Sequence, residues 1–359
     1  MKTDPLSPGK TVGILGGGQL GRMLSVAASR LGFKSHIFEP GANPPASHVA
    51  DRTTTAAYDD TAALTAFAES IDVITYEFEN IPTQALDTLE SRHPIRPGRR
   101  ALATSQDRLT EKQFLQSLGL TTAPFATIDT LADLTAAIDT IGTPGILKTR
   151  RFGYDGKGQV RLNPESDPAT ALAALKGAPA ILEGFVDFSL EVSVIAARGL
   201  NGEVSAFDPG ENVHRGGILH TTTVPAHLTG AQRTDAILLA GRILNALDYV
   251  GVMGVELFVT PQGLIVNEIA PRVHNSGHWT QNGCTIDQFE QHIRAITGWP
   301  LGDGSRHSDV EMENLIGDDV ARIPDIAKEP QTAIHLYGKA DFRPGRKMGH
   351  INRILPAKP

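Results

Sequence analysis

Residues 146–159 read Ile-Leu-Lys-Thr-Arg-Arg-Phe-Gly-Tyr-Asp-Gly-Lys-Gly-Gln, a short apolar run that delivers Lys148 and leads into a glycine-rich loop. Glycines allow backbone N–H groups to approach phosphate oxygens closely, and a lysine on a strand adds a compact positive charge. The chain contains neither a G-x-x-x-x-G-K-[ST] sequence nor the catalytic-loop and D-F-G sequences of protein kinases. The stretch therefore indicates a phosphate-binding loop of another kind, or else a flexible basic hairpin on the surface.

Length and composition predict a protein of several domains. The 359 residues exceed the roughly 250–300 at which a single core stops growing. A net charge of −7 and scattered aromatic residues give no footprint for nucleic acid. The single cysteine, Cys284, cannot form an internal disulfide, and the sequence has neither a signal peptide nor an apolar run that could span a membrane. We expect a cytoplasmic protein with no nucleic-acid or membrane partner.

The N-terminal segment predicts a β-α-β unit. Residues 11–15 form a short apolar strand, Gly16-Gly17-Gly18-Gln19-Leu20-Gly21 follows, residues 22–31 have a helical pattern, and a second strand over 33–38 ends in Glu39. A G-x-G-x-x-G turn with an acid 18 residues later is compatible with NAD. The motif alone is weak evidence, because a helix N-terminus of this kind binds any phosphate.

The rest of the chain predicts further α/β and α+β organisation. Residues 72–78 form a strand of the same parallel sheet, which places Glu77 at the carboxyl edge where ligands bind. Prolines and a glycine mark a boundary at 93–98, and a helix runs from Ser105 to Gly119. Strands and helices alternate over 121–186. Strands dominate afterwards, with helices over 231–247 and 286–296 and a closing pair of strands around 343–347.

Two glutamates in apolar strands are the strongest chemical feature. Residues 254–259 and 264–269 flank the turn 260–263 and should form a hairpin in which Glu256 and Glu268 lie opposite each other or nearly so. Two carboxylates in such a setting repel each other and lose solvation unless a cation lies between them. Mg²⁺ satisfies this requirement, and Asn267 adds an amide oxygen. The alternative is a pair of glutamates on a solvated face.

A dense polar segment, residues 267–278, follows the second of these strands. Arg272 can present its guanidinium fork to a planar carboxylate or to bicarbonate. His274 and His278 have the spacing of zinc ligands on a helix, but Ser276-Gly277 argues against a helix there. The segment predicts a loop that lines a site, in which a histidine is as compatible with a structural role as with a functional one.

These features together resemble the ATP-grasp superfamily and, within it, the 5-(carboxyamino)imidazole ribonucleotide synthase family, the ATPase subunit of phosphoribosylaminoimidazole carboxylase. The resemblance is carried by residues 16–23, 153–159, 251–256 and 267–283, and it extends from about residue 11 to about residue 353. It implies an N-terminal doubly wound parallel-sheet domain (1–104), an α+β lid domain (105–184) and an α+β C-terminal domain (185–359).

The resemblance also implies a reaction. Bicarbonate is joined to the exocyclic amine of 5-aminoimidazole ribonucleotide with ATP and Mg²⁺, through carboxyphosphate, in purine biosynthesis. It implies a homodimer and a functional link to the mutase that takes up the carbamate. Two departures are visible: the chain ends soon after residues 349–352, and Phe152 precedes Gly153 where other members have a small residue.

The resemblance assigns roles to individual residues. Arg108 and Lys148 contact phosphates, Glu191 binds ribose with His214 nearby, and Asn267 lies beside the metal ligands Glu256 and Glu268. The lid loop comprises Gly153, Tyr154, Asp155, Gly156, Lys157, Gly158 and Gln159, and the strand that reads adenine comprises Glu183, Gly184, Phe185 and Val186. Glu77 and Asp155 face the imidazole and its amine, and Tyr154 closes with the lid. Arg272, His274 and Asn275 hold bicarbonate. The glycine turn 18–21 and Lys339, Arg346 and Lys347 bind the acceptor phosphate, unless 343–347 is only a solvated turn.

Three alternatives remain open on the sequence. One is another ATP-grasp carboxylase or a formyl-transferring synthetase. The second is a nicotinamide-dependent dehydrogenase that uses the glycine turn 16–21. The third is a nucleotide-binding regulatory protein without catalytic activity.

Overall fold

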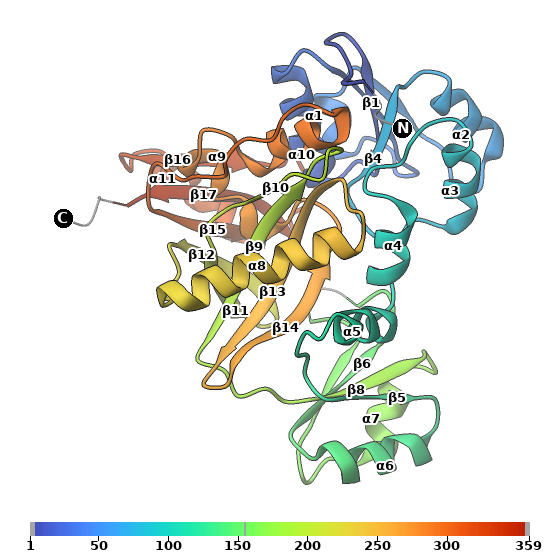
Figure 1. The fold of residues 1–359 in the computed structure, drawn as a ribbon, viewed down its shortest axis with the longest axis vertical. Coiled ribbons are helices and arrows are strands. Elements are labelled where there is room, and N and C mark those ends of the chain that lie inside the picture. Colours follow the sequence, from blue (N-terminus) through green and yellow to red (C-terminus); the bar gives the residue numbers. More distant parts are fainter. Residues whose placement is uncertain (1–3, 154–155, 356–359) are drawn as a thin grey trace.

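The computed structural model describes residues 4–153 and 156–355, which form three β-sheets with their helices (Figure 1). The predicted lid residues Tyr154 and Asp155 lie outside the described residues. A sheet of four strands is built from the N-terminal third, a second sheet of four from the middle, and a sheet of nine from the rest. No helix in the described part of the chain is long and apolar enough to cross a membrane.

The N-terminal sheet is parallel, as predicted. Its order is β3 (Arg52–Thr54), β2 (Lys34–Phe38), β1 (Thr11–Leu15) and β4 (Val73–Tyr76). Its helices are α1 (Gln19–Arg30), η1 (Pro45–His48), α2 (Thr61–Ala68), α3 (Thr83–Glu90) and α4 (Arg99–Ser105). The predicted β-α-β unit is confirmed, although α1 begins three residues earlier than expected. A side chain at Gly21 would lie 2.7 Å from the Gly16 carbonyl oxygen, so a glycine is needed for this close approach of helix and turn.

The expected helix from Ser105 to Gly119 is wrong at its start. Ser105 ends α4, and a separate helix, α5, covers Arg108–Ser117. The Asp107 carboxylate accepts hydrogen bonds from the N–H groups of Leu109 (2.9 Å) and Thr110 (3.3 Å). This side chain satisfies donors that a helix start leaves free, so a new helix begins there.

The central unit is an antiparallel sheet with helices on one side. Its order is β5 (Phe125–Ile128), β8 (Ala180–Gly184), β6 (Gly145–Thr149) and β7 (Gln159–Leu162), and its helices are α6 (Leu131–Ile141) and α7 (Pro168–Ala174). In Figure 1 this unit projects from the rest of the molecule at the bottom of the view. Lys148 lies near the end of β6, directly before the glycine loop, as the sequence predicts.

The nine-stranded sheet carries the C-terminal half. Along it lie β14 (Gly263–Ala270), β13 (Gly251–Thr260), β9 (Leu190–Arg198), β11 (Gly210–Arg215), β12 (Ile218–Val224), β15 (Val310–Ile316), β17 (Lys347–Ile354) and β16 (Thr332–Leu336), and β10 (Val204–Ala206) pairs with β9. The helices are α8 (Gly230–Ala246), α9 (Thr280–Gly283), α10 (Gln288–Thr297) and α11 (Ile323–Ile326), with the short 3₁₀ helices η2 (Asn275–Gly277) and η3 (Gly317–Arg322). The two predicted helices and the closing pair of strands are confirmed.

The N-terminal and C-terminal units share one hydrophobic core. Val12 and Leu24 belong to the same buried cluster as Phe289 and Ile293 of α10. His292 joins the units through polar contacts: its Nδ1 accepts from the Val252 N–H (3.0 Å), so its Nε2 donates to the Thr75 hydroxyl (2.7 Å). Burial lowers the pKa of His292 to about 3. The two units therefore form one body, and the central unit is the separate part.

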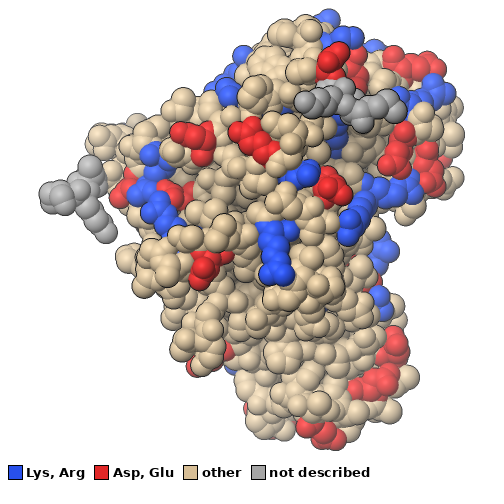
Figure 2. Space-filling model, viewed as in Figure 1, with Lys and Arg blue, Asp and Glu red and all other residues tan. Residues whose placement is uncertain are grey.

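Charged side chains of both signs are mixed on the face of the molecule shown in Figure 2. Among the described residues on that face, basic and acidic groups alternate without forming a continuous basic patch. Further lysine and arginine side chains, together with several glutamates, line a cleft between the three units.

Candidate active site

A cavity of about 890 Å³ lies where the three units meet. It is lined by the predicted site residues Glu77, Arg108, Lys148, Gly153, Gly156, Lys157, Gln159, Glu191, His214, Glu256, Asn267, Glu268, Arg272, His274, Asn275, Lys339, Arg346 and Lys347. Gly158, Glu183, Gly184, Phe185 and Val186 do not line the cavity as the described residues are arranged. One cleft therefore holds most of the residues that the sequence singles out.

The predicted carboxylate pair is confirmed. Strands β13 and β14 pair in antiparallel register, and Glu256 lies directly opposite Glu268. Burial and the charge of Glu268 raise the pKa of Glu256 to about 7. Burial alone would raise the pKa of Glu268 too, but the Arg108 guanidinium, 3.1 Å from its carboxylate, and the Lys148 ammonium hold that pKa below its usual value. The protein's own cations thus offset the repulsion at Glu268 but do not fully offset it at Glu256.

The donor set at this pair suits a hard divalent cation. Two carboxylates and the neighbouring Asn267 amide supply oxygen atoms, which Mg²⁺ prefers. The described residues contain no group of three or more histidine, cysteine, aspartate or glutamate side chains that could hold a metal by themselves. The site is therefore a pair of carboxylates to which a nucleotide's phosphates would add the remaining ligands.

The zinc alternative at His274 and His278 finds no support in the geometry. His278 is completely buried, and its Nδ1 accepts a hydrogen bond from the Gln288 amide (2.9 Å). His274 faces the cavity, with its Nδ1 2.8 Å from the Ser276 hydroxyl oxygen and its Nε2 3.7 Å from Glu256. Burial and the Arg272 charge lower the pKa of His274 to about 3, so the ring is neutral.

A buried group of charges lies beside the carboxylate pair. Lys148 donates to a carboxylate oxygen of Glu183 at 3.0 Å, and the Lys112 ammonium forms an ion pair with the same oxygen at 3.1 Å. The Glu183 side chain, which the resemblance places on the adenine strand, here lies behind the cavity wall. Burial lowers the pKa of Lys148, although the Glu183 charge opposes this. One carboxylate shared by two lysines leaves the group with a net positive charge, which faces the cavity through Lys148.

Glu191 and His214 form a second polar pair in the cavity. They lie on the adjacent strands β9 and β11, and Glu191 hydrogen-bonds the His214 Nδ1. Burial lowers the pKa of His214, but the hydrogen bond to Glu191 and the charge of Glu256 raise it above its usual value overall. A carboxylate oxygen held by a histidine is a suitable acceptor for ribose hydroxyls.

The glycine turn donates some of its N–H groups to the protein's own carboxylates. The Glu77 carboxylate accepts hydrogen bonds from the N–H groups of Gly18 and of Gly21, the latter at 2.7 Å. Glu39 likewise accepts from the N–H of Gly17 at 2.9 Å. Two of the four N–H groups of residues 18–21 are therefore taken by Glu77, whereas Gln19 and Leu20 line the cavity, so the acceptor-phosphate role of this turn stays a prediction. The same contacts oppose the dinucleotide alternative, because Glu39 is occupied by the protein's own backbone.

The predicted bicarbonate group is gathered at one wall of the cavity. Arg272 donates through Nε to Glu79 at 2.7 Å. Asn275 and Asn314 exchange amide hydrogen bonds of 2.9 and 2.7 Å, which fix the Asn275 side chain. Arg272, His274 and Asn275 thus sit side by side with their orientations held by neighbours outside the group, as a preformed anion site requires.

The basic residues of the C-terminal hairpin also line the cavity, and the Lys347 charge acts on both His274 and Glu256. The Lys339 ammonium donates to the Lys347 carbonyl at 2.7 Å, which brings the two ends of the loop together. Arg346 donates to the Asp341 carbonyl at 3.3 Å. The loop between β16 and β17 therefore presents its cations to the cavity rather than forming only a solvated turn.

The described part of the glycine loop has unusual backbone geometry. Phe152, Gly156 and Gly158 have φ angles of +63°, +76° and +70°. A side chain at Gly158 would lie 2.6 Å from the Thr149 hydroxyl oxygen, so this position requires glycine. A positive φ is uncommon for a residue other than glycine, so the backbone at Phe152 is unusual. The Phe152 side chain is 68% exposed.

Sequence reasoning missed several residues of α5 and the loop after β4. Glu111 and Lys112 are 3% and 1% exposed, and Glu79 holds Arg272. Burial and the charge of Glu268 raise the pKa of Glu111 to about 8. A signal was present: Arg108, Glu111, Lys112 and Leu115 have the i, i+3, i+4, i+7 spacing of a buried helix face. Charges on such a face indicate a site rather than a solvated surface.

Comparison with known protein families divides the chain into three consecutive matches. Residues 9–106 match the ribonucleotide synthetase preATP-grasp domain, residues 113–289 the ATP-grasp domain, and residues 311–358 the phosphoribosylaminoimidazole carboxylase C-terminal domain. This order, a preATP-grasp domain followed by an ATP-grasp domain, agrees with the three-sheet fold.

Similar proteins extend over the whole chain. The N5-carboxyaminoimidazole ribonucleotide synthase of Brucella melitensis is 55% identical over 99% of both chains. A crystal structure of an ADP complex of N5-carboxyaminoimidazole ribonucleotide synthetase has a TM-score of 0.95 and 42% identity, covering 98% of this chain and 94% of the other. A synthase from Aspergillus clavatus in complex with ADP and 5-aminoimidazole ribonucleotide has a TM-score of 0.91 and 33% identity, covering 97% and 94%.

Proposed function

The chain belongs to the N5-carboxyaminoimidazole ribonucleotide synthase family, ATP-dependent ligases of purine biosynthesis, and from this we propose how its cleft carries out the reaction. We propose that the enzyme joins bicarbonate to the exocyclic amine of 5-aminoimidazole ribonucleotide and converts ATP to ADP and phosphate. The observation that supports this most directly is the meeting of the Glu256–Glu268 pair, Lys148 and the group Arg272, His274 and Asn275 in one cavity. This observation also disfavours a regulatory protein that only binds a nucleotide.

The chemistry proceeds in two transfers. A bicarbonate oxygen attacks the γ-phosphorus of ATP, the bond from that phosphorus to the bridging oxygen breaks, and ADP leaves. The amine nitrogen then attacks the carboxyl carbon of carboxyphosphate, and phosphate leaves. Phosphoryl transfer depends mainly on positioning and charge neutralisation, which explains why the cleft contains cations and no protein nucleophile is needed.

Mg²⁺ fits the carboxylate pair. Glu256 and Glu268 would hold it, with the Asn267 amide oxygen nearby, because their mutual repulsion is only partly offset by Arg108. When bound, the ion neutralises charge on the transferred phosphoryl group. Arg108 and Lys148 lie on the same side of the cavity and would neutralise phosphate oxygens.

Different groups of cavity residues bind the different substrates in this proposal. Arg272, His274 and Asn275 would bind bicarbonate, and Lys339, Arg346 and Lys347 the acceptor phosphate. Glu191 with His214 would bind the ATP ribose. The loop 153–159 would close over the phosphates, because water hydrolyses carboxyphosphate.

The product is a labile carbamate, so a mutase that consumes it would act directly after this enzyme.

The test of the proposed function is ADP release by the purified protein. We expect release that requires both bicarbonate and 5-aminoimidazole ribonucleotide. ADP release supported equally by another amine acceptor, or unaffected when either substrate is omitted, would contradict it.

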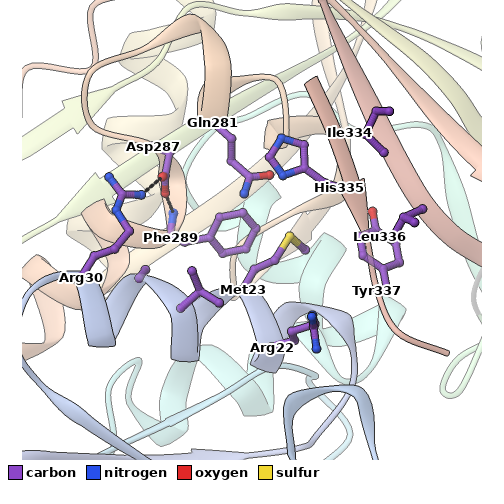
Figure 3. A pocket seen from close by; sticks show the side chains of 12 residues that line it. Arg22, Met23, Arg30, Gln281, Asp287, Phe289, Ile334, His335, Leu336 and Tyr337 are labelled. Atoms are coloured by element: carbon purple, nitrogen blue, oxygen red, sulfur yellow. Dashed lines mark hydrogen bonds and ion pairs between the residues drawn. The ribbon is translucent and has the colours of Figure 1, made fainter. Parts of the chain in front are cut away.

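We further propose that the chain forms a homodimer through the surface between α1 and β16. Strand β16 is the edge of the nine-stranded sheet, and exposed edges are ready to pair with another chain. Val26 and Leu336, 44% and 47% exposed, flank a pocket of about 230 Å³ in this surface. Figure 3 shows Met23 of α1 between Phe289 and Leu336 of β16, and all three line this pocket.

The mass in solution tests this arrangement. We expect the wild-type protein to have the mass of two chains in sedimentation equilibrium and Leu336→Lys to have the mass of one. A wild-type monomer, or an unchanged dimer in the variant, would contradict the proposed surface.

A further inference from the structure

A β-bulge aims two neighbouring side chains of β14 into the cleft. Glu256 pairs with Glu268, but the next residue of β13, Leu257, pairs with Val266, so Asn267 is an extra residue in β14. Side chains alternate between the faces of a regular strand, whereas a bulge changes their direction. Asn267 and Glu268 are consecutive and both line the cavity. The bulge therefore places an amide beside a carboxylate on one side.

Helix α5 holds this bulge from behind. The Lys112 ammonium donates to the Asn267 carbonyl at 3.4 Å, and the Glu111 carboxylate accepts from the N–H of Ile269. Two consecutive residues of α5 thus satisfy backbone groups on both sides of Glu268. Burying a charged side chain lowers the stability of the fold unless the charge is paired, so Glu111 and Lys112 are expected to serve a specific purpose here.

Lys112 has a second partner that leads to the other wall of the site. Its ammonium lies 3.1 Å from the Glu183 carboxylate oxygen that also accepts from Lys148 at 3.0 Å. Lys148 lines the cavity, whereas Lys112 is 1% exposed and lies behind the wall. A single buried ammonium therefore contacts both the strand that carries Glu268 and the carboxylate that orients Lys148.

We propose that Lys112 is a positioning residue that sets the relative placement of Glu268 and Lys148. This inference rests on the proposed function, in which these residues serve the metal and the phosphates. Without the Lys112 charge, Glu183 has Lys148 as its remaining close lysine partner and draws that ammonium away from the cavity. The Asn267 carbonyl also loses its donor, and Glu268 loses the support of its bulge.

The test compares ADP binding with and without Mg²⁺ by calorimetry in wild type, Lys112→Met and Lys112→Arg. Lys112→Met has a similar shape and no charge, and we expect its ADP affinity in Mg²⁺ to fall about tenfold or more, since one member of a buried ion group is removed. The ratio of the dissociation constants in chelator and in Mg²⁺ should shrink as well. Lys112→Arg keeps the charge and should recover most of this ratio. Lys328→Met, at an exposed lysine, is the matched control and should match the wild type.

Steady-state kinetics give a second readout. We expect Lys112→Met to raise KM for ATP and lower kcat, with KM for 5-aminoimidazole ribonucleotide nearly unchanged. Wild-type affinities and an unchanged Mg²⁺ ratio in Lys112→Met, with an active wild-type enzyme, would overturn the inference. If neither Lys112→Met nor Lys112→Gln yields folded protein, Lys112 serves the fold and the inference is also overturned. An inactive wild-type enzyme would instead refute the proposed function.

Discussion

Replacing Glu256 by glutamine should abolish ADP formation and at the same time stabilise the nucleotide-free protein. The wild-type carboxylate lies in a buried strand directly opposite Glu268, and the two repel each other. Glutamine keeps the shape and removes the charge. The prediction therefore separates the functional need for this carboxylate from its cost to the fold.

The magnitude follows from the pKa of Glu256. Burial and Glu268 raise this pKa from 4.5 to about 7. At 1.36 kcal/mol for each tenfold change in the proton affinity, the ionised side chain costs the folded state about 3 kcal/mol. Because the folded-state pKa is the higher one, the folded protein binds the proton more tightly. The contribution of Glu256 protonation to the free energy of unfolding is fully present below pH 4.5 and is lost as the pH rises through about 7.

Thermal and denaturant unfolding from pH 5 to pH 8, in chelator and without nucleotide, measures this effect. We expect the wild type to lose stability relative to Glu256→Gln over this range, until the variant is more stable by about 2–3 kcal/mol at pH 8. Glu165→Gln, at an exposed glutamate, is the control for the loss of one negative charge.

Glu268→Gln is the matched comparison and should act in the opposite direction. Arg108 holds the pKa of Glu268 low, so the ionised carboxylate stabilises the fold, and its removal leaves a largely buried guanidinium without its partner. Equal stability of wild type and Glu256→Gln at pH 8 would refute the reasoning. The reasoning would also be refuted if ADP with Mg²⁺ raised the free energy of unfolding of Glu256→Gln and of the wild type by the same amount.

Two further predictions concern the walls of the cleft. The loop 153–159 should be cut by protease at residues 154–157 in the free protein, and ADP with Mg²⁺ should suppress the cutting, because three glycines give the loop low local stability; equal cutting in both conditions would count against its role as a lid. Arg346→Glu should raise KM for 5-aminoimidazole ribonucleotide steeply and leave KM for ATP nearly unchanged, since Arg346 lies on the hairpin loop proposed to bind the acceptor phosphate and its guanidinium contacts Asp341 of that same loop. A fall in ATP affinity instead would assign the hairpin loop to the nucleotide site.

Local sequence patterns predict the strands and the carboxylate pair well. The turn 260–263 between two apolar runs fixes a hairpin whose register brings Glu256 to within one residue of Glu268, and the bulge at Asn267 then places the two directly opposite each other. The β-α-β unit and the position of Lys148 at the end of a strand are likewise local properties. Each depends on residues that are close together in the chain, so periodicity and turn composition are sufficient to predict them.

The features that the sequence does not reveal depend on distant partners. The Glu77 carboxylate occupies N–H groups of the glycine turn 56 and 59 residues away. The bulge at Asn267 and its contact with Lys112 join segments 155 residues apart. No local pattern contains these distances. The one sign in the sequence that α5 supports a site is that Arg108, Glu111 and Lys112 share the helix face of the apolar Leu115.

The oxygen atoms of bicarbonate provide the most direct test of the central claim. With ¹⁸O-labelled bicarbonate in unlabelled water, and a reaction shorter than the exchange of bicarbonate with water, carboxyphosphate formation transfers one bicarbonate oxygen to the released phosphate. We predict phosphate that carries one ¹⁸O atom when ATP and 5-aminoimidazole ribonucleotide are both present. Phosphate that takes its new oxygen from water while carboxylated product accumulates would contradict the account.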